Sequence, residues 1–164
     1  MKKVLIIGPF PNPISGVSIA NKVVEEILNA DLNFTVENLN TSYPIFDEQI
    51  GEFSIQKIFF KVLKNNIIYI TPGQTFFGVL KYALFIVAAS ALRKELIIHV
   101  HGNYLGKEYQ SLKGFKRVLF YFLVSRFTKG IVLSNSLKHN LTPFLEDKNI
   151  FSLPNFAQDY LYKE

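Results

Sequence analysis

The side chains best suited to chemistry are two histidines in the stretch IIHVHGNYLG, His99 and His101. They are two residues apart in an apolar run typical of a strand, so they share one face of it. We expect His99 to be a core residue, and His101, at the end of the strand, to hydrogen-bond a ligand or move a proton. At Gly102 and Asn103 the backbone can turn a polar group towards that ligand. No metal is expected, because no cysteine or carboxylate accompanies the histidines at the spacing of metal ligands.

A second candidate lies in GPFPNPISGVSIANKVVEEIL, residues 8–28, where an apolar run passes through a proline-rich loop into a helix pattern. Ser15 and Gly16 lie where this helix begins. Unpaired N–H groups at Gly16 and Val17 would face an anion there, and a glycine leaves room for it. The alternative is a tight turn in which the glycine serves only packing. The spacing fits neither G-x-G-x-x-G nor a P-loop, so neither a dinucleotide site nor a P-loop is predicted.

A third candidate is VLSNSLKHNL, where Ser134 follows a strand pattern and precedes a helix pattern. Ser134 could contact a ligand, but capping of the helix by Ser134, Asn135 or Ser136 explains the same pattern. His139 is expected on the exposed face of that helix. No Ser-His-acid constellation follows, because nothing links His101 to a serine within a nucleophile elbow.

The composition predicts a single globular domain with a substantial core. The chain has 164 residues, of which 49% are hydrophobic and 19% charged, and this excludes disorder as a global description. It has no cysteine, which excludes disulfides and thiolate metal sites. The most membrane-like segment, residues 76–92, is short for a span and contains Lys81, so we expect a buried crossover helix instead.

Short β-branched runs alternate with helical patterns, which predicts an α/β fold with a doubly wound, mostly parallel sheet and helices on both faces. The expected strands are 3–8, 33–39, 67–71, 96–100, 130–133 and 150–152, and the expected helices are 16–29, 54–65, 75–93, 114–126 and 135–146. Ligands of such sheets bind beyond the carboxyl ends of the strands. The three candidates meet at that edge, together with the loop at Pro72 and Gly73.

Basic residues recur at helical spacing in two phenylalanine-rich segments. Lys57, Lys61 and Lys64 form one face of the first, and Lys116 and Arg117 precede VLFYFLV in the second. In a chain with a net charge of +5, such helices suit an anionic membrane surface. The alternative is a solvated helix face above an ordinary core. Nucleic acid is not an expected partner, because the charge is modest and no recognition motif is present.

Four segments, taken in order, resemble the N-terminal, acceptor-side Rossmann-like domain of GT4-like glycosyltransferases with the GT-B fold. They are residues 8–28, HVHG at the end of the fourth expected strand, GIVLSNSLKHNL, and IFSLPNFAQD. The family's GG in the first loop appears as Ser15-Gly16, and its PNG-V-D at the domain junction appears as PNFAQD. The resemblance covers nearly the whole chain.

The resemblance implies retaining, metal-independent transfer of a sugar from a nucleotide-sugar, which is a substrate rather than a cofactor. Ser15 and Gly16 would lie near the donor phosphates and the acceptor. His101 would hydrogen-bond the transferred sugar, and the departing phosphate would take the acceptor proton. The expected donor is a UDP-hexose or UDP-HexNAc. The expected acceptor is a polyprenyl-diphosphate-linked saccharide of a bacterial surface polysaccharide, such as O-antigen or capsule.

The resemblance also implies a second Rossmann-like domain that binds most of the nucleotide-sugar. Residues 1–153 would form the N-terminal domain, and residues 154–164 would begin the linker to that second, C-terminal domain, which this sequence lacks. We therefore expect negligible transferase activity from this chain alone. It would act in the cytoplasm, peripherally bound to the inner face of the plasma membrane. Two alternatives stay open: a non-catalytic module that acts as a scaffold at a membrane surface, and a sugar-nucleotide epimerase, for which no acid/base residues are identified.

Overall fold

A computed structural model describes residues 1–42 and 55–154, and, within the second range, the side chains from residue 58 onward. It contains a six-stranded, all-parallel sheet in the order β2-β1-β3-β4-β5-β6. The strands are β1 (Lys2–Gly8), β2 (Phe34–Asn40), β3 (Ile67–Ile70), β4 (Glu95–Val100), β5 (Lys129–Val132) and β6 (Ile150–Ser152). The predicted α/β, doubly wound class is confirmed, and each expected strand forms with its ends within one residue of the prediction.

The strand order changes direction between β1 and β3. The chain runs from β1 to β2 on one side, then crosses β1 to reach β3 and continues outward to β6. In parallel α/β sheets this switch leaves a crevice at the carboxyl ends of the two central strands. The ends of β1 and β3 are therefore the place in this fold where a ligand is expected.

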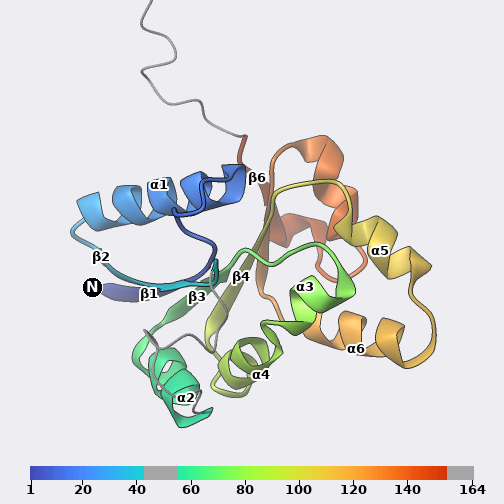
Figure 1. Cartoon of the computed structure of the whole chain (residues 1–164), viewed down its shortest axis with the longest axis horizontal. Helices are drawn as coiled ribbons and strands as arrows, with labels where there is room; N and C mark the ends of the chain where they lie inside the picture. The colour runs from blue at the N-terminus through green and yellow to red at the C-terminus, as the bar shows by residue number, and fades with distance from the viewer. Residues whose placement is uncertain (43–54, 155–164) are drawn as a thin grey trace, which may run out of the picture.

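Helices cover both faces of the sheet, as predicted, but unequally (Figure 1). The helix α1 (Gly16–Ala30) packs over β1 and β2 on one face, through Val24 and Leu28. The opposite face is covered by α2 (Ile55–Lys64), α3 (Phe76–Leu80), α4 (Ala83–Ala91) and α6 (Gly114–Val124). Three further elements, α5 (Leu105–Ser111), η2 (Asn135–Asn140) and η3 (Asp147–Asn149), complete the described helices.

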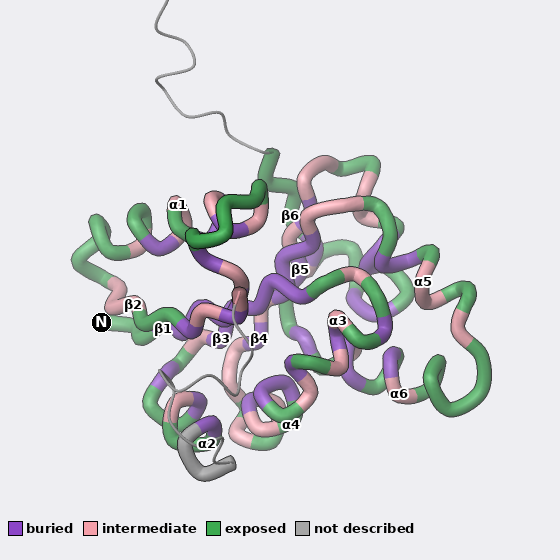
Figure 2. The backbone as a smooth tube through the Cα atoms, in the orientation of Figure 1, coloured by how far each residue is buried: buried purple, intermediate pink, exposed green. Residues whose placement is uncertain are grey.

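The core has two parts, one on each face of the sheet. The larger part joins Leu5, Ile7 and Ile98 of the strands to the inner sides of α2, α4 and α6. The smaller part lies under α1 and includes Val4 and Ile6. Figure 2 shows the buried residues following the strands and the sheet-facing sides of the helices. Because both faces of β1 are covered, its run VLII is apolar throughout, as parallel strands require.

Two predicted helices are wrong in extent. The single helix expected at 75–93 breaks into α3 and α4 around Lys81 and Tyr82, whose side chains both contact Thr41 at the end of β2. The helix expected at 135–146 is only the 3-10 helix η2, followed by turns. Pro143 has no N–H to continue an α-helix, and the side chain of Asn140 donates to the carbonyl of Leu137, a local bond that competes with helical backbone bonding.

Within the described ranges, no helix is long and apolar enough to cross a membrane. The expected interdomain linker, residues 154–164, lies outside the described residues apart from Pro154.

Candidate functional site

The loop after β1 leads into a capped N-terminus of α1. Ser15 is the N-cap: its hydroxyl accepts a hydrogen bond from the N–H of Ser18 (3.1 Å), and the Ser18 hydroxyl accepts one from the N–H of Ser15 (2.8 Å). This capping box leaves the N–H groups of Gly16 and Val17 without an acceptor among the described residues. A Cβ at Gly16 would meet no atom within 4 Å, so packing does not require glycine there. The two N–H groups are free to bind an anion.

Buried polar contacts hold this N-terminus against the ends of β1 and β3. Asn21, fully buried in α1, donates from Nδ2 to the carbonyl of Pro9 and to the hydroxyl of Thr71, both at 2.8 Å. Gly8 lies beside them, and a Cβ there would come within 1.9 Å of Thr71 Oγ1. Glycine is therefore required at this position for β1, β3 and α1 to approach so closely. These contacts set the position of the α1 N-terminus relative to the switch in strand order.

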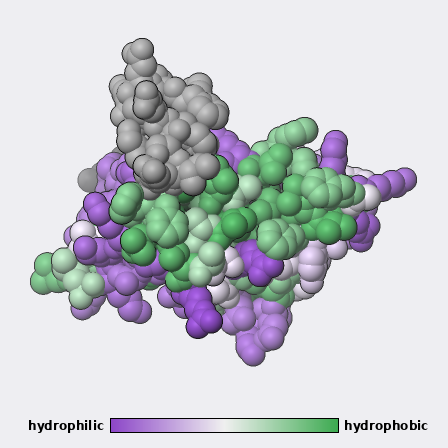
Figure 3. Space-filling view, turned by 90° about the horizontal axis from the view of Figure 1, so that it is seen from below, coloured by the Kyte–Doolittle hydropathy of each residue, from purple (hydrophilic) through white to green (hydrophobic). Residues whose placement is uncertain are grey.

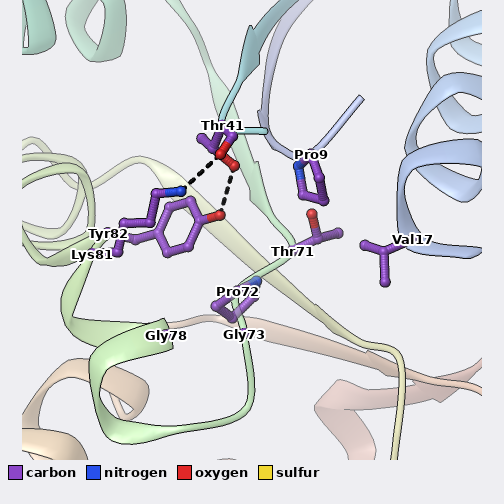
Figure 4. Close-up of a pocket in the computed structure, with 9 residues that line it drawn as sticks. All are labelled: Pro9, Val17, Thr41, Thr71, Pro72, Gly73, Gly78, Lys81 and Tyr82. Atoms are coloured by element: carbon purple, nitrogen blue, oxygen red, sulfur yellow. Dashed lines mark hydrogen bonds between the residues drawn. The ribbon is translucent and has the colours of Figure 1, made fainter. Parts of the chain in front are cut away.

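A hollow of about 290 Å³ opens at the carboxyl ends of β1, β2 and β3. Figure 4 shows Val17 on one side of it and Lys81 and Tyr82 on the other. Lys81 donates from Nζ to the carbonyl oxygen of Thr41 (2.7 Å), and the hydroxyl of Tyr82 is 2.9 Å from Thr41 Oγ1. Partial burial lowers the pKa of Lys81. The hollow thus has a cationic side chain on one wall and a helix N-terminus on the other, an arrangement that favours a negatively charged ligand.

The two histidines lie at the end of β4 with their rings side by side and tilted by 38°, so they share one face as predicted. Their ring centroids are 3.9 Å apart. His99 is 3% exposed, which confirms it as a core residue, and its Nδ1 is hydrogen-bonded to the hydroxyl of Tyr69. Burial, with a smaller contribution from His101, lowers the pKa of His99 to about 3, and burial lowers the pKa of His101 to about 4. Both imidazoles are therefore neutral at pH 7.

The Nε2 atoms of His99 and His101 are buried and have no hydrogen-bond partner in the described part of the chain. Buried polar atoms are normally paired, so an unpaired atom at the edge of a sheet marks a place where a ligand can bond. His101 is only partly buried, and it is the histidine that lies after the last residue of β4. As a neutral ring, it can donate at one nitrogen and accept at the other.

Beyond β4, Gly102 and Asn103 contact two residues that the sequence analysis did not assign to the site, Gln74 and His139. A Cβ at Gly102 would lie 2.3 Å from Nε2 of Gln74, and Oε1 of Gln74 accepts a hydrogen bond from the N–H of Tyr104 (2.7 Å). Oδ1 of Asn103 is 3.1 Å from Nε2 of His139. Gln74 and His139 therefore hold the His101 loop to β3 and η2. Gln74 directly follows the Pro72–Gly73 loop, a position in the chain that could have identified it.

Ser134 follows β5 and is the N-cap of η2, but its side chain makes no capping bond there. Its Oγ is 2.8 Å from Oγ of Ser136 instead. Of the three residues considered as caps, Ser134, Asn135 and Ser136, the structure therefore has Ser134 at the N-cap position, without a capping bond from its hydroxyl. Its predicted contact with a ligand stays a prediction.

The basic residues predicted at a membrane surface lie on two helices of the same layer. Lys64 of α2 and both Lys116 and Arg117 of α6 are exposed, and Lys61 is half-buried. The side chain of Lys57 lies outside the described residues. None of the described side chains among these lines the hollow.

In the described ranges, no three His, Asp or Glu side chains are grouped so that they could hold a metal ion. No model of a known protein family matches the chain, and no curated protein matches it in sequence.

Proposed function

We propose that this chain is the acceptor-side domain of a retaining, metal-independent glycosyltransferase. It would move a hexose or N-acetylhexosamine from a UDP-sugar to a polyprenyl-diphosphate-linked saccharide at the inner face of the plasma membrane, in bacterial surface polysaccharide synthesis. The observation that carries the proposal is the pair of unpaired N–H groups at Gly16 and Val17, beside a hollow at the switch in strand order. A diphosphate is the kind of group that such a helix N-terminus binds.

Each part of the site has a role in this proposal. The N–H groups of Gly16 and Val17 donate to a phosphate oxygen, and Lys81 adds positive charge from across the hollow. His101, neutral because burial lowers its pKa to about 4, exchanges a hydrogen bond with a sugar hydroxyl. The anomeric C–O bond to the diphosphate breaks, a new one forms to the acceptor hydroxyl, and the departing diphosphate takes that hydroxyl's proton.

The proposal is tested by titrating the isotope-labelled chain with UDP-glucose and with UDP-N-acetylglucosamine and following the amide signals by NMR. Binding rather than turnover is measured, because the proposal assigns most of the nucleotide to a second domain. The amides of Gly16 and Val17 should shift saturably. Gly114 is a matched control, since it begins α6 and its Cβ position is equally open. Equal shifts at Gly114, or none at Gly16, would contradict the proposal.

A second candidate function is a non-catalytic module that holds a partner protein at a membrane surface. It is favoured by the large apolar side chains that α2, α4 and α6 expose to solvent. For this function, Gly16→Val and His101→Ala should be harmless, whereas reversing the charges of Lys61 and Lys64 should abolish activity. If the full-length protein transfers sugar, Gly16→Val and His101→Ala should instead impair it more than the charge reversals at Lys61 and Lys64. Polysaccharide formation in cells that carry each variant distinguishes the two functions.

A further inference from the structure

The two described segments that contain the helices of one layer carry many cations and no carboxylate. Residues 55–94 and 113–126, which include α2, α3, α4 and α6, contain ten of the chain's 18 Lys and Arg and none of its 13 Asp and Glu. Among the described side chains, the ion pairs all involve residues outside these two ranges. Among the residues that the structure describes, no carboxylate forms an ion pair with a cation of this layer. The positive charge of this layer forms a field that attracts an anionic partner.

The same layer also exposes an apolar surface. On α6, Phe115, Val118 and Phe122 follow one another at helical spacing and are 75%, 67% and 41% exposed, while Phe120 and Leu123 on the opposite side are buried. The neighbouring helices add Phe59, Phe60 and Leu63 from α2 and Leu84 and Val87 from α4, each exposed by more than two-fifths. Figure 3, which views this layer from outside, shows a broad hydrophobic band across it with hydrophilic side chains around the band.

Cations lie directly beside the apolar side chains rather than on a separate face. The guanidinium carbon of Arg126 is 4.2 Å from the ring centroid of Phe122, and Nζ of Lys116 is 5.8 Å from that of Phe77. A long basic side chain next to an exposed ring can place its stem along the apolar surface and its charge in a more polar layer. This arrangement matches the boundary between headgroups and acyl chains of a bilayer.

We propose that this cationic apolar face, formed by α2, α3, α4 and α6, rests on the surface of an anionic lipid bilayer. Phenylalanine, leucine and valine side chains would enter the acyl boundary, and the lysines and arginines would contact anionic headgroups. A second copy of the chain is a poorer occupant, because a two-fold contact would set the same positive charge against itself. The inference deepens the proposed function, on which its plasma-membrane setting rests, by assigning the contact with lipid to one face of the molecule.

The test is flotation of the full chain with phosphatidylcholine vesicles, with and without phosphatidylglycerol. The wild-type chain should float with the anionic vesicles at low salt, and less with vesicles of phosphatidylcholine alone. Lys116→Gln with Arg117→Gln should weaken binding about 25-fold, since each cation near the surface contributes about fivefold. Phe115→Ser with Val118→Ser should weaken it at least about tenfold, because apolar burial is lost.

Matched controls separate this face from the rest of the surface. Ile27→Ser removes a side chain that is 63% exposed on α1, across the sheet, and Lys107→Gln removes an exposed cation on α5. Both should bind vesicles like the wild type. All the altered residues are exposed, so every variant should keep its denaturation midpoint, and this is measured in parallel.

The proposal is overturned if the wild-type chain does not bind anionic vesicles at low salt, or if face and control variants bind equally. It is also overturned if sedimentation shows a dimer that Phe115→Ser with Val118→Ser dissociates, while vesicles bind no protein. That result would assign the face to a second copy. Flotation requires no sugar donor, so the two experiments give independent results. The chain can fail to bind vesicles while the amide of Gly16 responds to the donor, and it can bind vesicles while that amide does not respond.

Discussion

Replacing Gly16 with aspartate separates the stability of α1 from its capacity to bind an anion. Gly16 is the first residue of the helix, and a Cβ there meets nothing within 4 Å, so the new side chain causes no clash. A carboxylate in the first turn of a helix is favourable by about 0.3–1 kcal/mol, and glycine is itself a poor helix former. The variant should therefore be as stable as the wild type or more stable.

The same carboxylate should oppose a bound phosphate. At a separation of about 5 Å, two unit charges repel by about 0.8 kcal/mol in water and about 3 kcal/mol at an effective dielectric constant of about 20. Gly16 is exposed, so the true value lies nearer the lower figure. Calorimetric titration with inorganic pyrophosphate should show that Gly16→Asp binds it at least about fourfold more weakly than the wild type. The loss should be greater if the aspartate carboxylate accepts a hydrogen bond from the free N–H of Val17.

Asn29→Asp is the matched control because it adds the same charge in the last turn of the same helix, at an exposed position. There the helix dipole opposes a negative charge, so stability should fall by about 0.3–1 kcal/mol while pyrophosphate binding is unchanged. If Gly16→Asp binds pyrophosphate as tightly as the wild type, and its denaturation midpoint is unchanged or higher, the anion site does not lie at this helix N-terminus. Equal weakening by Asn29→Asp would show that binding follows overall charge.

Two further predictions concern the packing beneath the site. The pKa values of His99 and His101 in the folded chain, about 3 and about 4, lie below the ordinary value of 6.5, so the unfolded chain binds protons first as the pH falls. Between pH 6.5 and about pH 4, each histidine should remove about 1.4 kcal/mol of unfolding free energy per pH unit, less for the partly exposed His101. Denaturant titrations should show that slope, and His99→Gln should reduce it. Gly8→Ala should cost about 1–3 kcal/mol, because its Cβ would lie 1.9 Å from Thr71 Oγ1. The cost should shrink when Thr71 is also alanine, and an unchanged denaturation midpoint in Gly8→Ala would contradict the close packing.

The strands could be predicted closely because each is a short apolar run with polar residues or turn formers at its ends. The presence and the ends of helices could be predicted less closely where contacts with distant parts of the chain determine them. The helix α5 was not predicted, since it is short and polar; its Glu108 accepts a hydrogen bond from the N–H of Phe76, and the N–H of Gly106 donates to Asn140. These partners are more than thirty residues away along the chain. Local patterns cannot encode such contacts.

The site was predictable where a single strand or loop determines it. The shared face of His99 and His101 follows from strand geometry alone, and the unpaired N–H groups at Gly16 and Val17 follow from the beginning of a helix. Lys81 and Asn21 were missed because their roles depend on strand order. Lys81 contacts the end of β2 and Asn21 the end of β3, and only the assembled sheet places these ends beside α1.

The hollow and the proposed lipid-binding face are close together along the chain. Lys81 and Tyr82 line the hollow, and Leu84, exposed on α4, belongs to the cationic apolar face. Three residues span no more than about 11 Å even when fully extended, so a molecule anchored in the bilayer has only a short distance to cover to reach Lys81. In the proposed acceptor, the lipid-linked diphosphate would stay at the lipid face, and the saccharide would extend from it toward the hollow, where Lys81 and the N–H groups of Gly16 and Val17 face the donor diphosphate. If this face binds lipid as proposed, an acceptor free in water would leave it without a role in sugar transfer, and this favours the lipid-linked class as the proposed acceptor.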